Sequence, residues 1–301
     1  MIANQLALLK RELWEHRSIY VAPAVIALLV ALMAITGQVT VSAHDEKVDL
    51  SVLAASHLSE AHRAAMLSAL MWGVAALFAI SMVVLIVFYT LDALYAERKD
   101  RSILFWRSLP VTDTETVVSK LLTALLVIPL QTIAAVIVTQ VIVLVCASIW
   151  VAGLGGDAWH LIWSAPPFAD IWLATLVFFL ALPLWLSPLI GWFLFVSAYA
   201  RRSTLLVAFL PLLVLPMLEK SLIGTRLFAE AFFVRSVQIP LFRGMDTGDF
   251  ELLQGRGLSF VALSHLDLVG FLTSPSLWIG LVVCGLLSAA AIYLRRYRDD
   301  S

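Results

Sequence analysis

A charged stretch between two apolar segments carries the residue types of this sequence that are best suited to bind another protein. It covers residues 92–116 and combines basic, acidic, aromatic and aliphatic side chains: Glu97, Arg98, Arg101, Phe105, Trp106, Arg107, Leu109 and Pro110. Buried aromatic anchors supply much of the affinity of protein interfaces, and basic side chains around them steer the approach of a partner. The stretch therefore predicts a folded element that docks on a partner protein.

A plainer interpretation of the same stretch stays open. Its apolar residues could rest on a membrane surface, while its basic residues only fix the orientation of the chain. Under either interpretation a new helix follows Pro110. Thr112 or Asp113 can cap this helix, and Glu115 in its first turn suits the positive end of the helix dipole.

Motifs for nucleotide binding or hydrolysis are absent from the sequence. The Gly-Leu-Gly-Gly of residues 153–156 lacks the following Lys-Ser or Lys-Thr that grips phosphate and magnesium, and neither HExxH nor GxSxG occurs. Ionisable residues are scarce within the apolar segments, whereas ion-coupled carriers and intramembrane enzymes place them there. We therefore expect this chain to have no catalytic residue and no cofactor.

Metal-ligand residue types gather in one polar loop, at residues 42–65. They are His44, Asp45, Glu46, Asp49, His57, Glu60 and His62. The last two histidines are five residues apart, about 140° around a helix, and so do not share a face. A solvated loop is the simpler explanation, and whether these residues bind anything stays open. Cys146 and Cys284 lie in apolar runs without CxxC spacing, which is typical of small core residues.

The composition requires lipid to cover much of the surface. Of the 301 residues, 61% are hydrophobic and 14% are charged, and the mean hydropathy is +0.96, whereas soluble domains have about 25% charged residues. Such a chain has too few polar groups to cover its apolar surface in water. The net charge of −1 argues against a nucleic-acid partner, which requires a basic face.

We predict an all-α integral membrane protein that forms a single transmembrane domain over 1–301. Six segments are apolar enough to cross a bilayer: 19–40, 66–91, 117–150, 171–200, 203–222 and 276–294. Residues 1–17 form an amphipathic helix suited to the membrane interface, with Ile2, Leu6, Leu9 and Leu13 on its apolar face and Asn4, Lys10, Arg11, Glu12 and Glu15 on the other. The mixed residues 223–275 predict re-entrant or interfacial helices before the last span.

Length and proline content predict irregularities in three spans. As a helix, the third apolar run would measure about 50 Å, against ~30 Å for the hydrocarbon core, so we expect it to tilt or project and to kink at Pro129. The fourth span contains Pro183 and Pro188, and the fifth contains Pro211 and Pro216. We expect these helices to bend.

The distribution of Lys and Arg predicts that both termini are cytoplasmic. With six spans, this orientation places 13 of the 20 basic residues inside: Lys10, Arg11, Arg17, Arg98, Lys99, Arg101, Arg107, Lys120, Arg201, Arg202, Arg295, Arg296 and Arg298. Among the others, only Lys47 and Arg63 lie in a short outer loop. A bacterial inner membrane fits this pattern.

The chain resembles the permease subunits of type 2 ABC exporters. The likeness rests on the acidic-Arg pair Glu97-Arg98, the Ser-Leu-Pro-Val of residues 108–111 and the capping residues before the third span, and it extends to the order of the spans. At motif level it covers about thirty residues. Many relatives have Gly-Thr-Leu-Glu where this chain has residues 101–106, so the contacts of this element differ.

The resemblance implies a coupling helix that docks on a separate ABC ATP-binding subunit, which hydrolyses the ATP. It also implies a second permease copy, identical or similar, and membrane lipid around both. The residues it assigns to this contact are those named above, from Glu97 to Pro110. A membrane anchor or assembly protein without a transport role is the alternative. The sequence leaves the transported substrate open.

Overall fold

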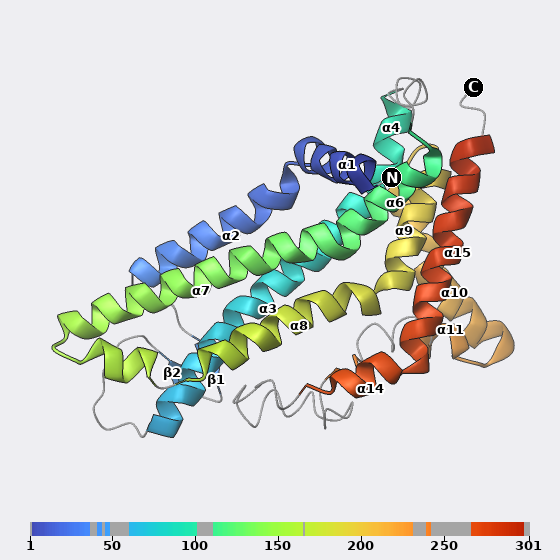
Figure 1. The fold of residues 1–301 in the computed structure, drawn as a ribbon. Helices are drawn as coiled ribbons and strands as arrows, with labels where there is room; N and C mark the ends of the chain where they lie inside the picture. The colour runs from blue at the N-terminus through green and yellow to red at the C-terminus, as the bar shows by residue number, and fades with distance from the viewer. Residues whose placement is uncertain are drawn as a thin grey trace.

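The computed structural model describes residues 2–36, 41–43, 46–48, 60–100, 111–164, 166–230, 239–241 and 266–297. Its helices form one bundle, as Figure 1 shows. Six segments are long and apolar enough to cross a membrane: Ser18–Ile35, Met66–Lys99, Asp113–Gly153, Phe168–Trp185, Thr204–Ile223 and Pro275–Tyr297. In the described part of the chain the strands are two short ones, β1 (Val41–Ala43) and β2 (Glu46–Val48), which pair antiparallel. The predicted all-α integral membrane fold is thereby confirmed.

The first two helices form the N-terminal part of the bundle. Helix α1 (Ile2–Glu15) is the predicted amphipathic helix, and α2 (Ser18–Ile35) is the first span. Helix α2 ends at Ile35 with Thr36 as its C-cap, and the last four residues of the predicted segment 19–40 lie outside the described residues. Figure 1 shows α1 at the same end of the bundle as α4, α6 and the end of α15. We call this the cluster end.

The second span is α3 (Glu60–Ala93), which begins earlier than the sequence predicts. A turn at Leu94 separates it from α4 (Tyr95–Lys99). A break leaves backbone amides without helical partners. Here the amides of Leu94 and Tyr95 donate to the Ser197 hydroxyl, each at 3.0 Å. The chain is therefore held at this turn by a side chain from another helix.

The third span is one long helical segment in three parts. Helix α6 (Asp113–Leu122) leads through a π-helical turn, η2 (Thr123–Val127), into α7 (Ile128–Gly153). Pro129 lies at the start of α7 and has no N–H to donate to the turn before it. The predicted irregularity at Pro129 therefore takes the form of a π-turn one helical turn earlier.

The fourth span differs from the prediction. The segment 171–200 is two helices, α8 (Phe168–Trp185) and α9 (Ser187–Tyr199), joined at Leu186, and Figure 1 shows that they run in different directions. Pro188 begins α9, where a missing N–H costs little. Pro183 lies inside α8. Pro183 and Pro188 thus lie on either side of a break between two helices.

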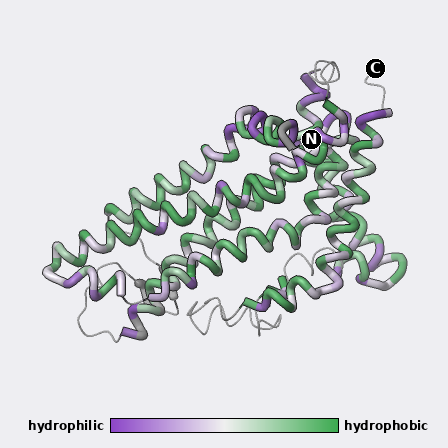
Figure 2. Tube along the Cα trace, viewed as in Figure 1, coloured by the Kyte–Doolittle hydropathy of each residue, from purple (hydrophilic) through white to green (hydrophobic). Residues whose placement is uncertain are grey.

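The remaining helices complete the bundle. A π-turn, η3 (Trp159–Trp163), precedes α8, and α10 (Thr204–Leu218) continues through η4 (Glu219–Ile223) to α11 (Leu227–Ala229). The short α14 (Leu268–Thr273) leads into the last span, α15 (Pro275–Tyr297). Most of the predicted re-entrant region 223–275 lies outside the described residues. Figure 2 shows apolar residues along the spans and hydrophilic ones at the ends of α4 and α15.

Helices α9 and α15 approach each other closely at Gly191. A Cβ added to this glycine would lie 2.9 Å from the Cα and 3.1 Å from the carbonyl oxygen of Cys284. Both atoms belong to the backbone of α15 and cannot move independently of that helix. Small residues allow membrane helices to pack at this distance. Gly191 therefore fixes the separation of α9 and α15.

We expect Gly191→Ala to destabilise the protein by about 1–3 kcal/mol, because the two helices must move apart. Gly285→Ala on α15 is the matched control, since a Cβ there meets nothing within 4 Å. The measurement is the free energy of unfolding in mild detergent, from titration with a denaturing detergent. Equal stability of the two variants would contradict the close contact.

Candidate functional site

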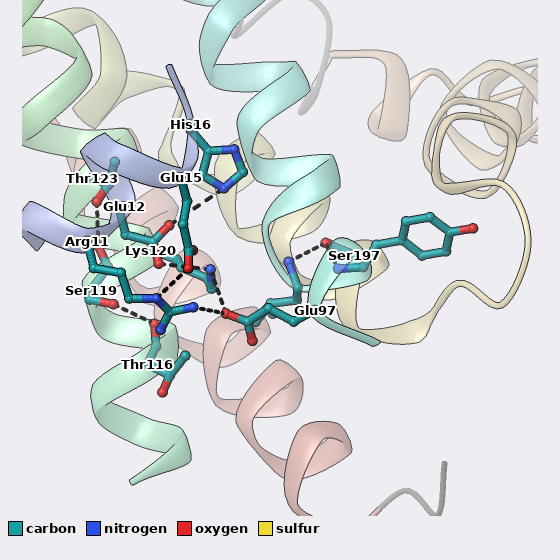
Figure 3. A network of polar contacts seen from close by, with 12 residues as sticks. Arg11, Glu12, Glu15, His16, Glu97, Thr116, Ser119, Lys120, Thr123 and Ser197 are labelled. Atoms are coloured by element: carbon teal, nitrogen blue, oxygen red, sulfur yellow. Dashed lines mark hydrogen bonds and ion pairs between the residues drawn. The ribbon is translucent and has the colours of Figure 1, made fainter. Parts of the chain in front are cut away.

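Six ionisable side chains from α1, α4, α6 and α15 meet at the cluster end of the bundle, and Figure 3 shows several of them with their hydrogen-bond partners. We call them the charge cluster: Arg11, Glu12, Glu97, Asp113, Lys120 and Arg295. Three are acidic and three are basic, so their formal charges cancel. Isolated charges are costly to bury, whereas paired and hydrogen-bonded ones can be kept inside a protein.

Lys120 lies at the centre of the cluster and is fully buried. Its ammonium nitrogen Nζ is 2.9 Å from Oε1 of Glu12 and 3.1 Å from Oε1 of Glu97. The second oxygen of Glu12 accepts a hydrogen bond of 2.8 Å from the Tyr89 hydroxyl on α3. Glu12 is also fully buried, and both its oxygens are satisfied. This pairing attaches α1 to α3 and α6.

Glu97 connects the largest number of helices. Oε1 accepts from Lys120 and from Arg11 Nη2, the latter at 3.0 Å, and Oε2 accepts from Arg295 Nη1 at 2.5 Å. Arg295 also donates through Nε to Asp113 Oδ1 at 2.8 Å. The carboxylate of Glu97 is 94% buried. One acidic side chain on α4 therefore holds cations from α1, α6 and α15.

The predicted amphipathic helix α1 turns part of its charged face into the bundle. Glu12 and Arg11 point inward to their partners, while Leu6 and Trp14 are 62% and 70% exposed. The reason is electrostatic, because Lys120, Glu97 and Tyr89 offer partners for that face. Leu13 packs against the apolar core of the bundle, whereas the exposed Leu6 and Trp14 are available to lipid.

The start of α6 is fixed by a capping box. The Thr112 hydroxyl accepts from the amide of Glu115 at 3.2 Å, and the Glu115 carboxylate accepts from the amide of Thr112 at 3.0 Å. The predicted cap is confirmed, and Thr112 rather than Asp113 supplies it. Asp113 is therefore available for Arg295.

Arg98 lies beside the charge cluster and donates hydrogen bonds to a different helix, α9. Its Nη2 donates to the carbonyl oxygens of Ser197 and Ala200, at 2.5 and 2.9 Å. These carbonyls are at the C-terminal end of α9, where basic side chains stabilise unpaired carbonyls and the negative end of the helix dipole. Tyr95 supports the same turn, because its hydroxyl donates to the Arg202 carbonyl at 2.7 Å.

Two of the residues predicted to contact a partner are thus part of the bundle. Glu97 and Arg98 bind side chains and carbonyls of their own chain. The other six, Arg101, Phe105, Trp106, Arg107, Leu109 and Pro110, lie outside the described residues. Sequence reasoning missed the role of Glu12, Lys120 and Arg295. The available signal was Lys120, a charge just inside an apolar run.

Burial and neighbouring charges perturb two groups on α1. Burial opposes the charged form of Arg11, but the carboxylates of Glu15, Glu97 and Glu12 outweigh it and raise its pKa. Burial lowers the pKa of His16, and Lys120 lowers it further against the opposing effect of Glu12. His16 packs edge-on against Tyr89 at 4.9 Å between ring centroids. It is therefore held as a neutral ring beside the cluster.

The cluster is arranged for structure and not for bond-making chemistry. Each of its carboxylates has a cation within 3.1 Å, so none is poised as a base. Among the described residues, no group of three or more His, Cys, Asp or Glu side chains could hold a metal ion. Most of the polar loop 42–65 lies outside those residues. Comparison with protein-family models, with curated proteins and with solved structures found no match.

Removing the central cation should destabilise the fold strongly. We expect Lys120→Met to lower the free energy of unfolding by about 3–5 kcal/mol, because it leaves the Glu12 and Glu97 carboxylates buried without it. The double variant Lys120→Met with Glu12→Gln should recover part of this loss. Lys10→Met is the control, since Lys10 is exposed on α1. A Lys120→Met protein as stable as the control would contradict the assignment.

Stability should also fall as the medium is acidified, through His16. Its pKa is lower in the folded protein than the ordinary value of 6.5, so the unfolded chain takes up the proton first as the pH falls. Protonation therefore favours unfolding as the pH falls from about 7 through that ordinary value. We expect the unfolding midpoint of the native sequence to fall more steeply in this range than that of His16→Gln. Parallel pH profiles would contradict this.

Proposed function

We propose that this protein is the membrane-spanning permease subunit of an ATP-driven type 2 ABC exporter. The observation that carries the proposal is the position of the charge cluster. Helix α4 ends at Lys99 and α6 begins at Asp113, so the cluster lies at the base of the stretch whose motifs resemble a coupling helix. A partner that pushes on this stretch acts on α4 and α6 directly.

The ion pairs provide the next step of the coupling. Glu97 on α4 and Lys120 on α6 are bonded to each other and to α1 and α15. Breaking such a buried pair costs about 3–5 kcal/mol. A displacement of α4 and α6 is therefore passed on to the first helix and the last span, instead of being absorbed locally. This is the behaviour required of a segment that transmits ATP-driven motion.

The distribution of charge supports the orientation. The cluster end carries Arg11, Arg98, Lys120 and Arg295, and the positive-inside rule makes it the cytoplasmic side of a bacterial inner membrane. The apolar spans favour an apolar or amphipathic substrate. ATP hydrolysis belongs to separate subunits, and a second permease copy completes the path.

The deciding experiment is affinity purification of tagged protein from detergent-solubilised native membranes. We expect an ABC ATP-binding subunit in about equal amount, and at least a tenfold loss of it, roughly 1.4 kcal/mol, in the double variant Trp106→Ala, Arg107→Ala. The reason is that the aromatic anchor and its adjacent charge are lost together. Trp14→Ala with Lys10→Ala on α1 is the control, because it also removes one tryptophan and one basic residue, here from exposed positions that contact each other.

The outcomes separate the two candidate functions. An ATP-binding subunit that is lost with the Trp106 variant and kept with the Trp14 variant supports the exporter. A non-ATPase partner, or no partner, contradicts it and supports a membrane anchor or assembly protein. An ATP-binding subunit retained equally by both variants would leave the exporter class in place and contradict the docking site.

A further inference from the structure

An open groove lies at the cluster end, outside the charge cluster. It has a volume of about 620 Å³ and lies between the C-terminal end of α9, the start of α10 and the end of α15. The lining residues are Tyr199, Ala200, Arg201, Val207, Tyr293, Leu294 and Tyr297. Its volume is in the range of ligand sites, about 300–1,000 Å³.

The walls of the groove change in polarity along the bundle axis. Val207 and Leu294 lie within α10 and α15, whereas Arg201 lies in the turn between α9 and α10. Tyr199 and Tyr297 are the last residues of their helices and are 53% and 62% exposed. Tyrosines at helix ends mark the boundary between hydrocarbon and headgroups. The groove therefore extends from the acyl-chain level to the headgroup level.

The rim of the groove is positively charged. Arg201 is exposed, and its guanidinium forms no ion pair or hydrogen bond with the described residues. Arg296 does not line the groove, but its guanidinium lies 5.5 Å from the ring centroid of the lining residue Tyr297. A guanidinium presents a fork of N–H groups that matches phosphate oxygens. The charge of the rim thus requires an anionic occupant.

The groove also opens toward lipid. Helix α10 has only 11% of its span buried in the bundle, so its flank faces the surrounding bilayer. It is held against α9 by Trp192, whose Nε1 donates to the Ala208 carbonyl at 3.1 Å. A molecule that enters from the membrane meets Val207 and Leu294 with its chains and Arg201 with its headgroup.

From these observations we infer that the groove between α9, α10 and α15 is a binding site for an anionic phospholipid. The phosphate is bound at Arg201, and an acyl chain lies against Val207 and Leu294. The tyrosines hold the glycerol region between them. The site bridges the little-buried α10 and the last span, and it does not depend on the exporter assignment.

The test is native mass spectrometry of the full chain, delipidated in mild detergent and re-equilibrated with equal amounts of phosphatidylglycerol and phosphatidylcholine. We expect the native protein to retain phosphatidylglycerol in preference. Arg201→Gln should reduce this retention about fivefold, which corresponds to the loss of one basic contact at a membrane surface. Val207→Trp, which fills the groove without changing charge, should reduce retention of both lipids.

Arg202→Gln is the control, because it removes the same charge from the next residue, which does not line the groove. Its phosphatidylglycerol retention should equal that of the native protein. An equal loss in the Arg201 and Arg202 variants would overturn the proposal, because it would show general attraction by surface charge. Equal retention of the two lipids by the native protein would overturn it as well. Unchanged elution on gel filtration verifies that each variant is folded.

Discussion

The need to pair every buried charge is the constraint on which this structure depends. Glu97 accepts from Arg11, Lys120 and Arg295, which come from three helices. An ion removed from water loses several kcal/mol of solvation, and only close partners restore it. Each of these helices must therefore be placed in depth and rotation to within the reach of one side chain. Apolar packing alone does not specify the rotation of a helix in lipid so closely.

The spans could be predicted from sequence because a bilayer fixes the length of an apolar segment. The charge cluster could not, because its members are far apart in the chain. Glu97 and Arg295 are 198 residues apart, and Glu12 and Lys120 are 108 apart. The helical period of α1 showed two faces, but it did not say which one meets protein. That choice is made by Lys120 and Tyr89, which lie far along the chain and which a pattern within α1 does not reveal.

In two spans a proline predicts that the helix is irregular, but it does not predict the form of the irregularity. Pro129 and Pro188 both lack an N–H, yet one is accommodated by a π-turn and the other begins a new helix. At two other helix ends the groups that satisfy the backbone can be named. At the turn between α3 and α4, Ser197 accepts from two amides, and Arg98 donates to the last carbonyls of α9. Such compensation depends on neighbours in space, which a sequence does not display.

The composition of the charge cluster also sets an order for assembly. Helix α1 is synthesised first, but Lys120 emerges more than a hundred residues after Glu12, and Arg295 comes in the last span. Glu12 lacks its cation until Lys120 has been made, and Glu97 and Asp113 lack Arg295 until α15 has been made. Chains are made from the N-terminus, and long-range contacts close last. The charge cluster is therefore completed only when α15 has been inserted, because Arg295 on this helix pairs the last of the buried carboxylates.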